Sequence, residues 1–242
     1  MVARHIKQDA RRAFDIMRSD GIAIIALDVG YGAFAISSHA LKRIFDSKRR
    51  GSHKRNGMIG DMIMHRELHS LGPAERDMVE AIVVDYDLPL GVIAPFRAEH
   101  PVLKNVDQEA LRASTLGQTL SLLLNAGPLH DELARLSREE KLAILGSSAN
   151  LTGTGVKYRL CDIQPEIIDI ADVTIDYGLC KYHHYGRSST MINFQTRKVV
   201  RIGICYELIS DIMLRHFDIE LPPDPGVDAL PSGHLSEYVG AN

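Results

Sequence analysis

Seven Lys or Arg residues and a single Asp lie within residues 42–55, KRIFDSKRRGSHKR. The pattern indicates a helix, a Gly-Ser break and further cations, an order that can aim several positive charges at one polyphosphate. Arg grips two phosphate oxygens at once, and Lys acts as a point charge. The segment therefore predicts a polyphosphate site, and a solvated helix face is the alternative that a charge run leaves open.

Small hydroxyl and amide residues follow a predicted buried strand in LGSSANLTG, residues 145–153. Ligands of α/β sheets sit beyond the carboxyl ends of strands, where short side chains and free backbone N–H groups are available. The segment is therefore a candidate ligand loop. A helix cap or a turn uses the same residue types, so that interpretation stays open as well.

A third candidate lies near the end of the patterned region. Residues 185–194, YGRSSTMINF, enter a strand through Gly-Arg-Ser-Ser, and residues 198–203, KVVRIG, return from it as in a hairpin. Arg187 and Arg201 could flank an anion from two sides. An ordinary hairpin with surface arginines is the alternative.

Strand and helix patterns alternate around these segments. Short apolar runs predict strands at 22–28, 33–37, 90–96, 119–124, 142–146, 173–176, 189–194 and 198–203. Helical spacing and capping residues predict helices over 5–19, after Ser37 or Ser38, from Pro73 onward and over 130–141. We expect residues 97–116 to be irregular. The alternation favours the α/β class.

Composition divides the chain near residue 204. The length of 242 residues with 45% apolar content suits one α/β domain plus an appendage, so we assign residues 1–204 to the domain. Residues 205–242 begin with an amphipathic stretch, ELISDIMLRHF, and continue as a tail rich in Pro, Gly and Asp. Such a tail is expected to be loosely held.

Charge, cysteine content and missing motifs restrict the function classes. The formal net charge is −3, so a nucleotide or nucleic-acid site has to be a local patch. Three scattered cysteines without a CxxC pair argue against disulfides or structural zinc and fit a reducing cytosol. With no signal-peptide pattern and no run near the ~18 apolar residues of a bilayer span, we expect a cytoplasmic protein without membrane contact. The sequence has no GxSxG, no GxxxxGK and no GxGxxG after a strand.

Five short motifs in order resemble the YrdC family, which includes threonylcarbamoyl-AMP synthase. The family's Pro-Thr-Asp-Thr-x-Tyr-Gly turn is matched by residues 26–32, ALDVGYG, and its Lys-x-Arg motif with a following Lys by residues 48–54. Its Ser-Ala-Asn-x-Ser/Thr-Gly, Ser-Thr-x-x-Asp/Asn and Leu-Arg-x-Gly motifs are matched by residues 148–153, 189–193 and 200–203. Each motif alone is weak, but five in this order over residues 8–204 are specific.

The resemblance implies a fold, an activity and a set of substrates. The expected fold is a twisted mixed sheet with flanking helices and a basic concave face. The expected enzyme is a nucleotidyltransferase that joins an amino acid, bicarbonate and ATP into an N-carbamoyl adenylate for tRNA t6A modification. In the family, threonine and bicarbonate give an N-carboxy amino acid whose carboxylate attacks the α-phosphate of ATP and releases pyrophosphate. Mg²⁺ is expected with ATP, held through phosphate oxygens.

The resemblance also assigns roles to residues of this chain. Lys48 and Arg50 are the implied catalytic residues. The implied nucleotide-binding residues are Lys48, Arg50, Lys54, Ser148, Asn150 and Arg201, and the implied acceptor-binding residues are Asp28, Tyr31, Ser147 and Ser189. No metal ligands are expected from the protein.

Most departures from the family pattern lie at positions that, in the family, shape the pocket for the amino-acid acceptor. The turn has Ala26, Leu27 and Val29 where the family has Pro and two Thr, and a Val-Arg-Val-Pro strand expected near 119–128 reads TLSLLLNAGP. A site that hydrogen-bonds its substrate discriminates strongly, so losing these groups changes or weakens the acceptor. ATP binding is therefore supported more firmly than threonine.

Two other functions stay open. One is a carbamoyl-adenylate or carbamoyl-transfer enzyme that acts on a different acceptor in specialised biosynthesis. The other is a non-catalytic module that binds double-stranded RNA through the basic concave face. Bicarbonate-dependent pyrophosphate release separates the enzymes from the RNA-binding module, whose affinity would fall steeply with salt.

Overall fold

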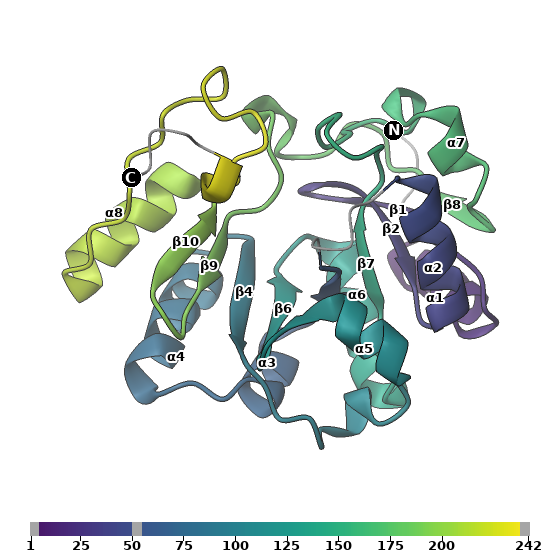
Figure 1. Cartoon of the computed structure of the whole chain (residues 1–242), viewed down its shortest axis with the longest axis horizontal. Coiled ribbons are helices and arrows are strands. Elements are labelled where there is room, and N and C mark those ends of the chain that lie inside the picture. Colours follow the sequence, from purple (N-terminus) through teal and green to yellow (C-terminus); the bar gives the residue numbers. More distant parts are fainter. Residues whose placement is uncertain (1–4, 50–54, 238–242) are drawn as a thin grey trace.

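The computed structural model describes residues 5–49 and 55–237. Within them the chain forms one ten-stranded mixed sheet in the order β10-β9-β4-β6-β3-β7-β2-β1-β8, and β5 pairs with β6 outside this path. Figure 1 shows α8, β9 and β10 on one side of the molecule and α1, α2, β1 and β8 on the other. The predicted mixed sheet with flanking helices is confirmed.

Short strands build the sheet. They are β1 (Ala23–Leu27), β2 (Gly30–Ala35), β3 (Gly57–Ile59), β4 (Leu90–Pro95), β5 (Thr115–Leu116), β6 (Thr119–Leu124), β7 (Leu145–Ser148), β8 (Val173–Ile175), β9 (Met191–Asn193) and β10 (Lys198–Arg201).

Helices cover the sheet. They are α1 (Ile6–Arg18), α2 (Ser38–Ser47), α3 (Met62–Leu68), α4 (Pro73–Glu80), α5 (Gln108–Ser114), α6 (Pro128–Glu140), α7 (Pro165–Ile168) and α8 (Tyr206–Phe217), and a π-helical turn over Ala81–Asp85 continues α4. No helix in the described part of the chain combines the length and the apolar character that crossing a bilayer requires.

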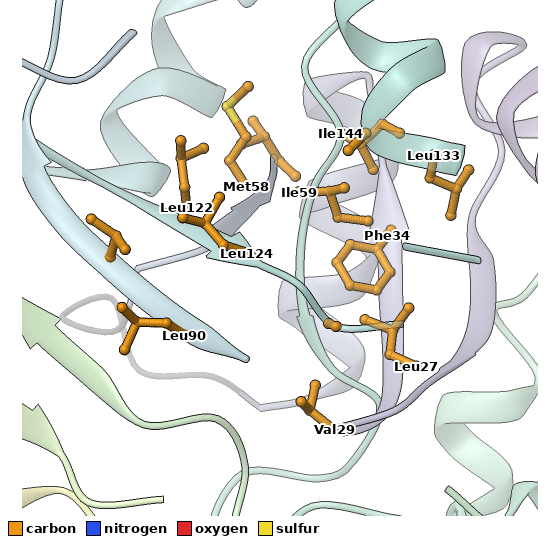
Figure 2. Close-up of a cluster of buried hydrophobic side chains, with 14 of the residues drawn as sticks. Leu27, Val29, Phe34, Met58, Ile59, Leu90, Leu122, Leu124, Leu133 and Ile144 are labelled. Atoms are coloured by element: carbon orange, nitrogen blue, oxygen red, sulfur yellow. The ribbon is translucent and has the colours of Figure 1, made fainter. Parts of the chain in front are cut away.

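The core lies in the middle of the sheet, where apolar strands supply side chains to both faces. Every residue of β1 is buried. Figure 2 shows Leu27 and Val29 of the β1–β2 hairpin in one cluster with Leu90, Leu122 and Leu124 of β4 and β6. Complete burial of such a side chain contributes about 1.5–3 kcal/mol relative to its exposure. The core thus fixes the strands whose ends carry the polar candidates.

Strand pairing brings several of these ends together. Strand β4 begins where β6 ends, since Leu90 pairs with Leu124, and β9 begins beside the start of β4. The β1–β2 turn reaches the same place, because the Asp28 N–H donates to the Ala126 carbonyl just beyond β6 at 2.8 Å. The end of β7 adjoins this turn, since β7 pairs with β2 up to Ser148. We name this rim of strand ends the polar edge.

Residues 97–116 are not irregular, and that prediction is wrong. The segment forms a 3₁₀ turn, helix α5 and strand β5. The Asp107 side chain caps α5 by accepting from the Ala110 N–H at 2.9 Å. The helix is only seven residues long, too short for its buried positions to stand out as a periodic pattern in the sequence. Strand β3 and helix α3 are also short, and for this reason the sequence pattern did not predict them.

The tail is held more firmly than its composition predicts. Leu221 and Leu230 are 6% and 2% exposed. The buried Arg187 donates to both carboxylate oxygens of Asp224, at 2.8 and 2.9 Å, and to the Leu230 carbonyl at 3.0 Å. The Ile202 N–H, just after β10, donates to the Gly233 carbonyl at 2.8 Å. The expectation of a loosely held extension is therefore wrong for residues 218–237, since polar contacts and two buried leucines hold the tail against the domain.

Candidate functional site

Lys48 holds the loop that follows β7. It comes directly after α2 and is 2% exposed. Its Nζ donates to the carbonyl oxygens of Ser148 and Asn150, the latter at 2.6 Å. Its own carbonyl accepts from the Thr152 N–H at 3.1 Å. A cation of the basic segment thus builds the candidate ligand loop, while its contact with a phosphate stays a prediction. Arg50 and Lys54 lie outside the described residues.

The end of β7 and the loop after it contain two buried polar atoms without a hydrogen-bond partner in the fold. They are Ser147 Oγ and Asn150 Oδ1. The amide of Asn150 is held in place because its Nδ2 donates to the Leu151 carbonyl at 2.6 Å. A buried polar atom left without a partner costs about 1–3 kcal/mol, so native proteins rarely leave one unless a ligand or a water fills the place. A ligand or a water at this place would therefore find two acceptor atoms, Ser147 Oγ and Asn150 Oδ1, that the fold leaves open.

The β1–β2 turn is joined to this loop through Tyr31. The residue is 1% exposed, and its backbone carbonyl accepts from the Ala149 N–H at 2.8 Å. Its hydroxyl donates to the Asp176 carboxylate and lies 3.0 Å from the Gly178 carbonyl oxygen. Burial, and then Asp176, raises the pKa of Tyr31, so the phenol stays protonated and remains a donor.

Asp28, in the same turn, is packed against the start of α6. A Cβ atom on Gly127 would lie 2.5 Å from Asp28 Cγ, and the φ of Gly127 is +105°. Only glycine satisfies both conditions. The side chain of Asp28 is 25% exposed and lies 4.0 Å, through Oδ2, from Lys181 Nζ. Asp28 is therefore a partly accessible carboxylate held at the polar edge.

Ser189, two residues before β9, and Arg201, the last residue of β10, form a second polar group. Arg201 donates through Nε to the Ser189 carbonyl and through Nη2 to Ser189 Oγ, both at 2.9 Å. Thr190 Oγ1 donates to the Ile204 carbonyl at 2.9 Å and accepts from the Gly203 N–H at 3.1 Å. A Cβ on Gly203 would lie 2.1 Å from the Ser188 carbonyl oxygen, so the chain can pass there only as glycine. This packing explains the Ser-Thr and Arg-x-Gly motifs.

Arg187 does not serve as the partner of Arg201 around an anion. Its side chain is 2% exposed and is bound to Asp224. The sequence pattern suggested two flanking arginines, but the structure uses one of them to hold the tail.

Residues 156–158 connect the two polar groups. The Tyr31 N–H donates to the Lys157 carbonyl at 2.8 Å. Tyr158 donates its hydroxyl to the Arg187 carbonyl at 2.6 Å, and its own carbonyl accepts from the Cys180 N–H at 3.0 Å. The described site residues therefore follow one continuous rim. They are Asp28, Tyr31, Lys48, Ser147, Ser148, Asn150, Ser189 and Arg201.

Sequence reasoning missed three residues of this rim. Tyr158 and Asp176 tie neighbouring segments together, and Lys181 faces Asp28. Only Lys181 had a signal in the sequence. Residues 180–185, CKYHHY, place a cation among aromatic residues just before the Gly-Arg-Ser-Ser segment. Within the described ranges, no three His, Cys, Asp or Glu side chains are grouped so as to hold a metal ion.

The chain is similar to a family of known proteins. A model of the Sua5/YciO/YrdC family, described as "Telomere recombination", matches residues 15–203. No curated protein matches the chain.

Several solved structures have the same fold. P. abyssi Sua5 complexed with L-threonine is 20% identical, with a TM-score of 0.69 over 91% of this chain and 61% of that chain. A hypothetical protein from Streptococcus mutans UA159 is 20% identical, with a TM-score of 0.71 over 87% of this chain and 93% of that one. Full-length HypF in its phosphate- and nucleotide-bound form is 17% identical, with a TM-score of 0.60 over 84% of this chain and 30% of HypF.

The chain thus spans about three fifths of the length of P. abyssi Sua5. The family match begins within α1 and ends just beyond β10, so it includes every described residue of the polar edge. The chain belongs to the Sua5/YciO/YrdC family.

Proposed function

We propose that this protein is an ATP-dependent enzyme that forms an N-carbamoyl adenylate from an amino acid and bicarbonate, as threonylcarbamoyl-AMP synthases do. The observation that carries the proposal is the end of β7 together with the loop that follows it. A buried Lys48 holds it, and it presents Ser147 Oγ and Asn150 Oδ1 without partners. Both the membership in the family and the nucleotide bound to the related HypF fold support a nucleotide there.

The donor set fits an anionic substrate better than a protein-bound metal. The described rim offers an ammonium, a guanidinium, hydroxyls and amides, which stabilise phosphate charge by hydrogen bonds. Ser189 Oγ is oriented by Arg201 Nη2 at 2.9 Å. Mg²⁺ would enter with ATP and supply charge neutralisation through phosphate oxygens. Ser148, Asn150 and Arg201 are the proposed nucleotide contacts, together with Lys48, Arg50 and Lys54.

The proposed reaction needs positioning rather than a side-chain nucleophile. The amine of the acceptor condenses with bicarbonate, forming an N–C bond and releasing water, and becomes a carbamate. A carbamate oxygen then bonds to the α-phosphorus while the bond to the bridging oxygen breaks, and pyrophosphate leaves with the displaced charge. The protein has to align two anions and compensate the charge that builds on the phosphates. Fixed cations and oriented amides perform both tasks.

The acceptor side favours a second candidate, an enzyme of the same reaction type with a different acceptor. Ala26, Leu27 and Val29 are 7%, 4% and 4% exposed. Apolar side chains therefore fill positions where the family pattern has Pro and two hydroxyl residues. Asp28, Tyr31, Ser147 and Ser189 remain the proposed acceptor contacts, and threonine is one acceptor among those to be tested.

One experiment tests the reaction and identifies the acceptor. The protein is incubated with ATP, isotope-labelled bicarbonate and a pool of amino acids, and the products are read by mass. We expect pyrophosphate release that requires bicarbonate and an adenylate that carries the label. Pyrophosphate release without bicarbonate, or none with any acceptor, would overturn the proposal. In the latter case, RNA binding with a steep salt dependence would favour the RNA-binding module instead.

A further inference from the structure

Exposed apolar side chains gather around α8. Eight large hydrophobic side chains are exposed in the described part of the chain, and four of them lie on α8 or at the π-helical turn that packs against it. They are Val84, Tyr86, Leu208 and Leu214, each between 47% and 52% exposed. Apolar side chains that gather on the surface of a soluble protein often mark a site of interaction. The surface around α8 is therefore a candidate for such a site.

The π-helical turn places Tyr86 against the end of α8. The Tyr86 N–H donates to the Ala81 carbonyl at 3.0 Å, which closes the wide turn. The Tyr86 hydroxyl lies 2.7 Å from His216 Nε2, and the centres of the two rings are 5.7 Å apart. Turns of this kind are rare and occur frequently at functional sites. The turn and α8 thus form one surface.

Two grooves border α8. The first has a volume of about 320 Å³ and lies between the carboxyl-terminal end of α8 and residues 77–86. The second has a volume of about 380 Å³ and lies between the side of α8 and residues 222–224. Phe217 lines the first groove and Leu214 the second. Sites for small molecules span roughly 300–1,000 Å³, so each groove is at the lower end of this range and suits single side chains of a larger partner.

Carboxylates line both grooves, and neither groove is lined by a described lysine or arginine. Arginines pair with three of these carboxylates, whereas the described chain shows no ion pair for the other three. The paired ones are Glu80, Asp211 and Asp224, and the others are Asp77, Asp85 and Glu207. We name the four exposed apolar residues and these six carboxylates the α8 face. It combines apolar contact area with negative charge.

The charge of the α8 face argues against a second copy of this chain as its occupant. In a two-fold symmetric contact the same surface meets itself. The unpaired carboxylates of two copies would then lie opposite one another, and the contact of like charges is unfavourable. Charge complementarity requires a partner with positive charges beside its apolar side chains.

We propose that the α8 face binds a basic amphipathic helix of another protein. The apolar side of that helix covers Leu208 and Leu214, and its lysine and arginine side chains reach the carboxylates of the two grooves. Helices bind to protein surfaces in this way when an apolar stripe enters a groove and the flanking charges match. The proposal concerns a surface outside the polar edge, and it does not depend on the proposed function.

The α8 face adjoins the segment that leads into the polar edge. Glu207 Oε1 accepts from the Tyr185 hydroxyl at 2.6 Å. Asp224 accepts from Arg187, which lies two residues before Ser189. None of the proposed nucleotide or acceptor contacts lines either groove. A helix bound to the α8 face would therefore lie beside this segment and leave the polar edge open.

A synthetic peptide tests the proposal. The probe has roughly 18 residues, or about five helical turns, with leucine along one side of the helix and lysine at the other positions. A peptide of the same composition, with its leucines distributed around the helix, is the control. Binding of each labelled peptide to the full chain is measured by fluorescence anisotropy. We expect a dissociation constant on the order of 10 µM at low salt for the probe and roughly 10-fold weaker binding for the control. Added salt should weaken the binding of the probe.

Variants locate the binding surface. Leu214→Ser removes apolar contact area and Asp85→Asn removes an unpaired charge, so each should weaken binding of the probe by about 5-fold or more. Ile63→Ser and Asp162→Asn are the matched controls, because Ile63 is 45% exposed on α3 and Asp162 is exposed outside both grooves. Both control variants should bind the probe as the unaltered chain does.

The outcomes decide between the occupants. Weaker binding in Leu214→Ser and Asp85→Asn, with unchanged binding in the two control variants, supports the proposal. The proposal is overturned if the probe does not bind at concentrations up to about 1 mM, if the control peptide binds equally well, or if all four variants bind alike. Sedimentation of the unaltered chain alone tests the second copy. A dimer that Leu214→Ser converts to a monomer would assign the α8 face to self-association and would overturn the proposal as well.

Discussion

Two lysines at the polar edge lie in opposite environments. Lys48 is 2% exposed and donates to two backbone carbonyls, at the end of β7 and in the loop after it. Lys181 is 58% exposed in its side chain and stands 4.0 Å from a carboxylate. The first is therefore part of the architecture of the site, whereas the second is available to whatever enters it. Their removal should accordingly affect different measurements.

The largest effect is expected from Lys48→Met. The change removes the Lys48 donor from both the Asn150 carbonyl and the Ser148 carbonyl, of which the latter still accepts from the Asn150 N–H at 3.0 Å. The free energy of unfolding should fall by about 2–4 kcal/mol. Turnover should be lost as the loop moves. Urea denaturation measures the stability, and Lys181→Met serves as the control whose midpoint should not change. Equal midpoints for the two variants would remove the distinction drawn above.

Asn150→Ala should separate binding from stability within the loop. Its Oδ1 has no partner in the fold, so the substitution removes an acceptor that the proposed nucleotide would use. We expect the KM of ATP to rise roughly 10-fold or more, with a stability loss near 1 kcal/mol from the Leu151 hydrogen bond. Asn105→Ala is the matched control, since its Nδ2 also donates to a backbone carbonyl, that of Lys141, at 3.3 Å. An unchanged KM in Asn150→Ala would place the nucleotide elsewhere.

Acid should destabilise the protein through a pair of histidines. Burial, the largest cause for each, lowers the pKa of His65 from 6.5 to about 4 and that of His69 from 6.5 to about 3. The unfolded chain therefore takes up protons that the folded chain refuses, and stability falls as the pH drops below 6.5. We expect a loss of roughly 1–2 kcal/mol for each histidine between pH 7 and pH 5.

The measurement is the urea midpoint as a function of pH, and His65→Gln should flatten the curve. A loss of activity in acid without unfolding would instead indicate that a group at the polar edge takes up a proton. That group would not be Lys181, which remains charged over this range. A midpoint that does not change between pH 7 and pH 5 contradicts the assignment to the histidines.

The smallest effect is expected from Asp224→Asn. Asp224 is 38% exposed in its side chain, so its ion pair with Arg187 is partly screened by water. We expect about 1 kcal/mol of destabilisation, because Arg187 stays buried with a weaker partner. Hydrogen exchange should become faster in residues 226–237. Asp228→Asn, at an exposed position of the same tail, should leave the exchange rates as they are.

The sequence predicted the parts of the molecule whose pattern is local. Apolar runs and caps identified β1, β4, β6 and α6, and short motifs identified the polar residues at their ends. Two features could not be read in this way. The use of Arg187 to hold Asp224 depends on contacts between residues 37 positions apart, and the approach of Lys181 to Asp28 depends on how two loops meet. A composition rich in Pro and Gly correctly predicts an irregular tail, but it does not reveal that a buried arginine of the domain binds this tail.

Tyr31 gives the site a property that no single contact suggests. Its carbonyl binds the loop that presents Asn150, and its hydroxyl binds Asp176 and the segment leading to Lys181. Under the proposed function, ATP would bind the first of these segments and the acceptor would bind beside the second, so we expect Tyr31, which contacts both, to link the two occupancies. Linkage of this kind is reciprocal, so ATP should improve the affinity for the acceptor by the factor by which the acceptor improves that for ATP.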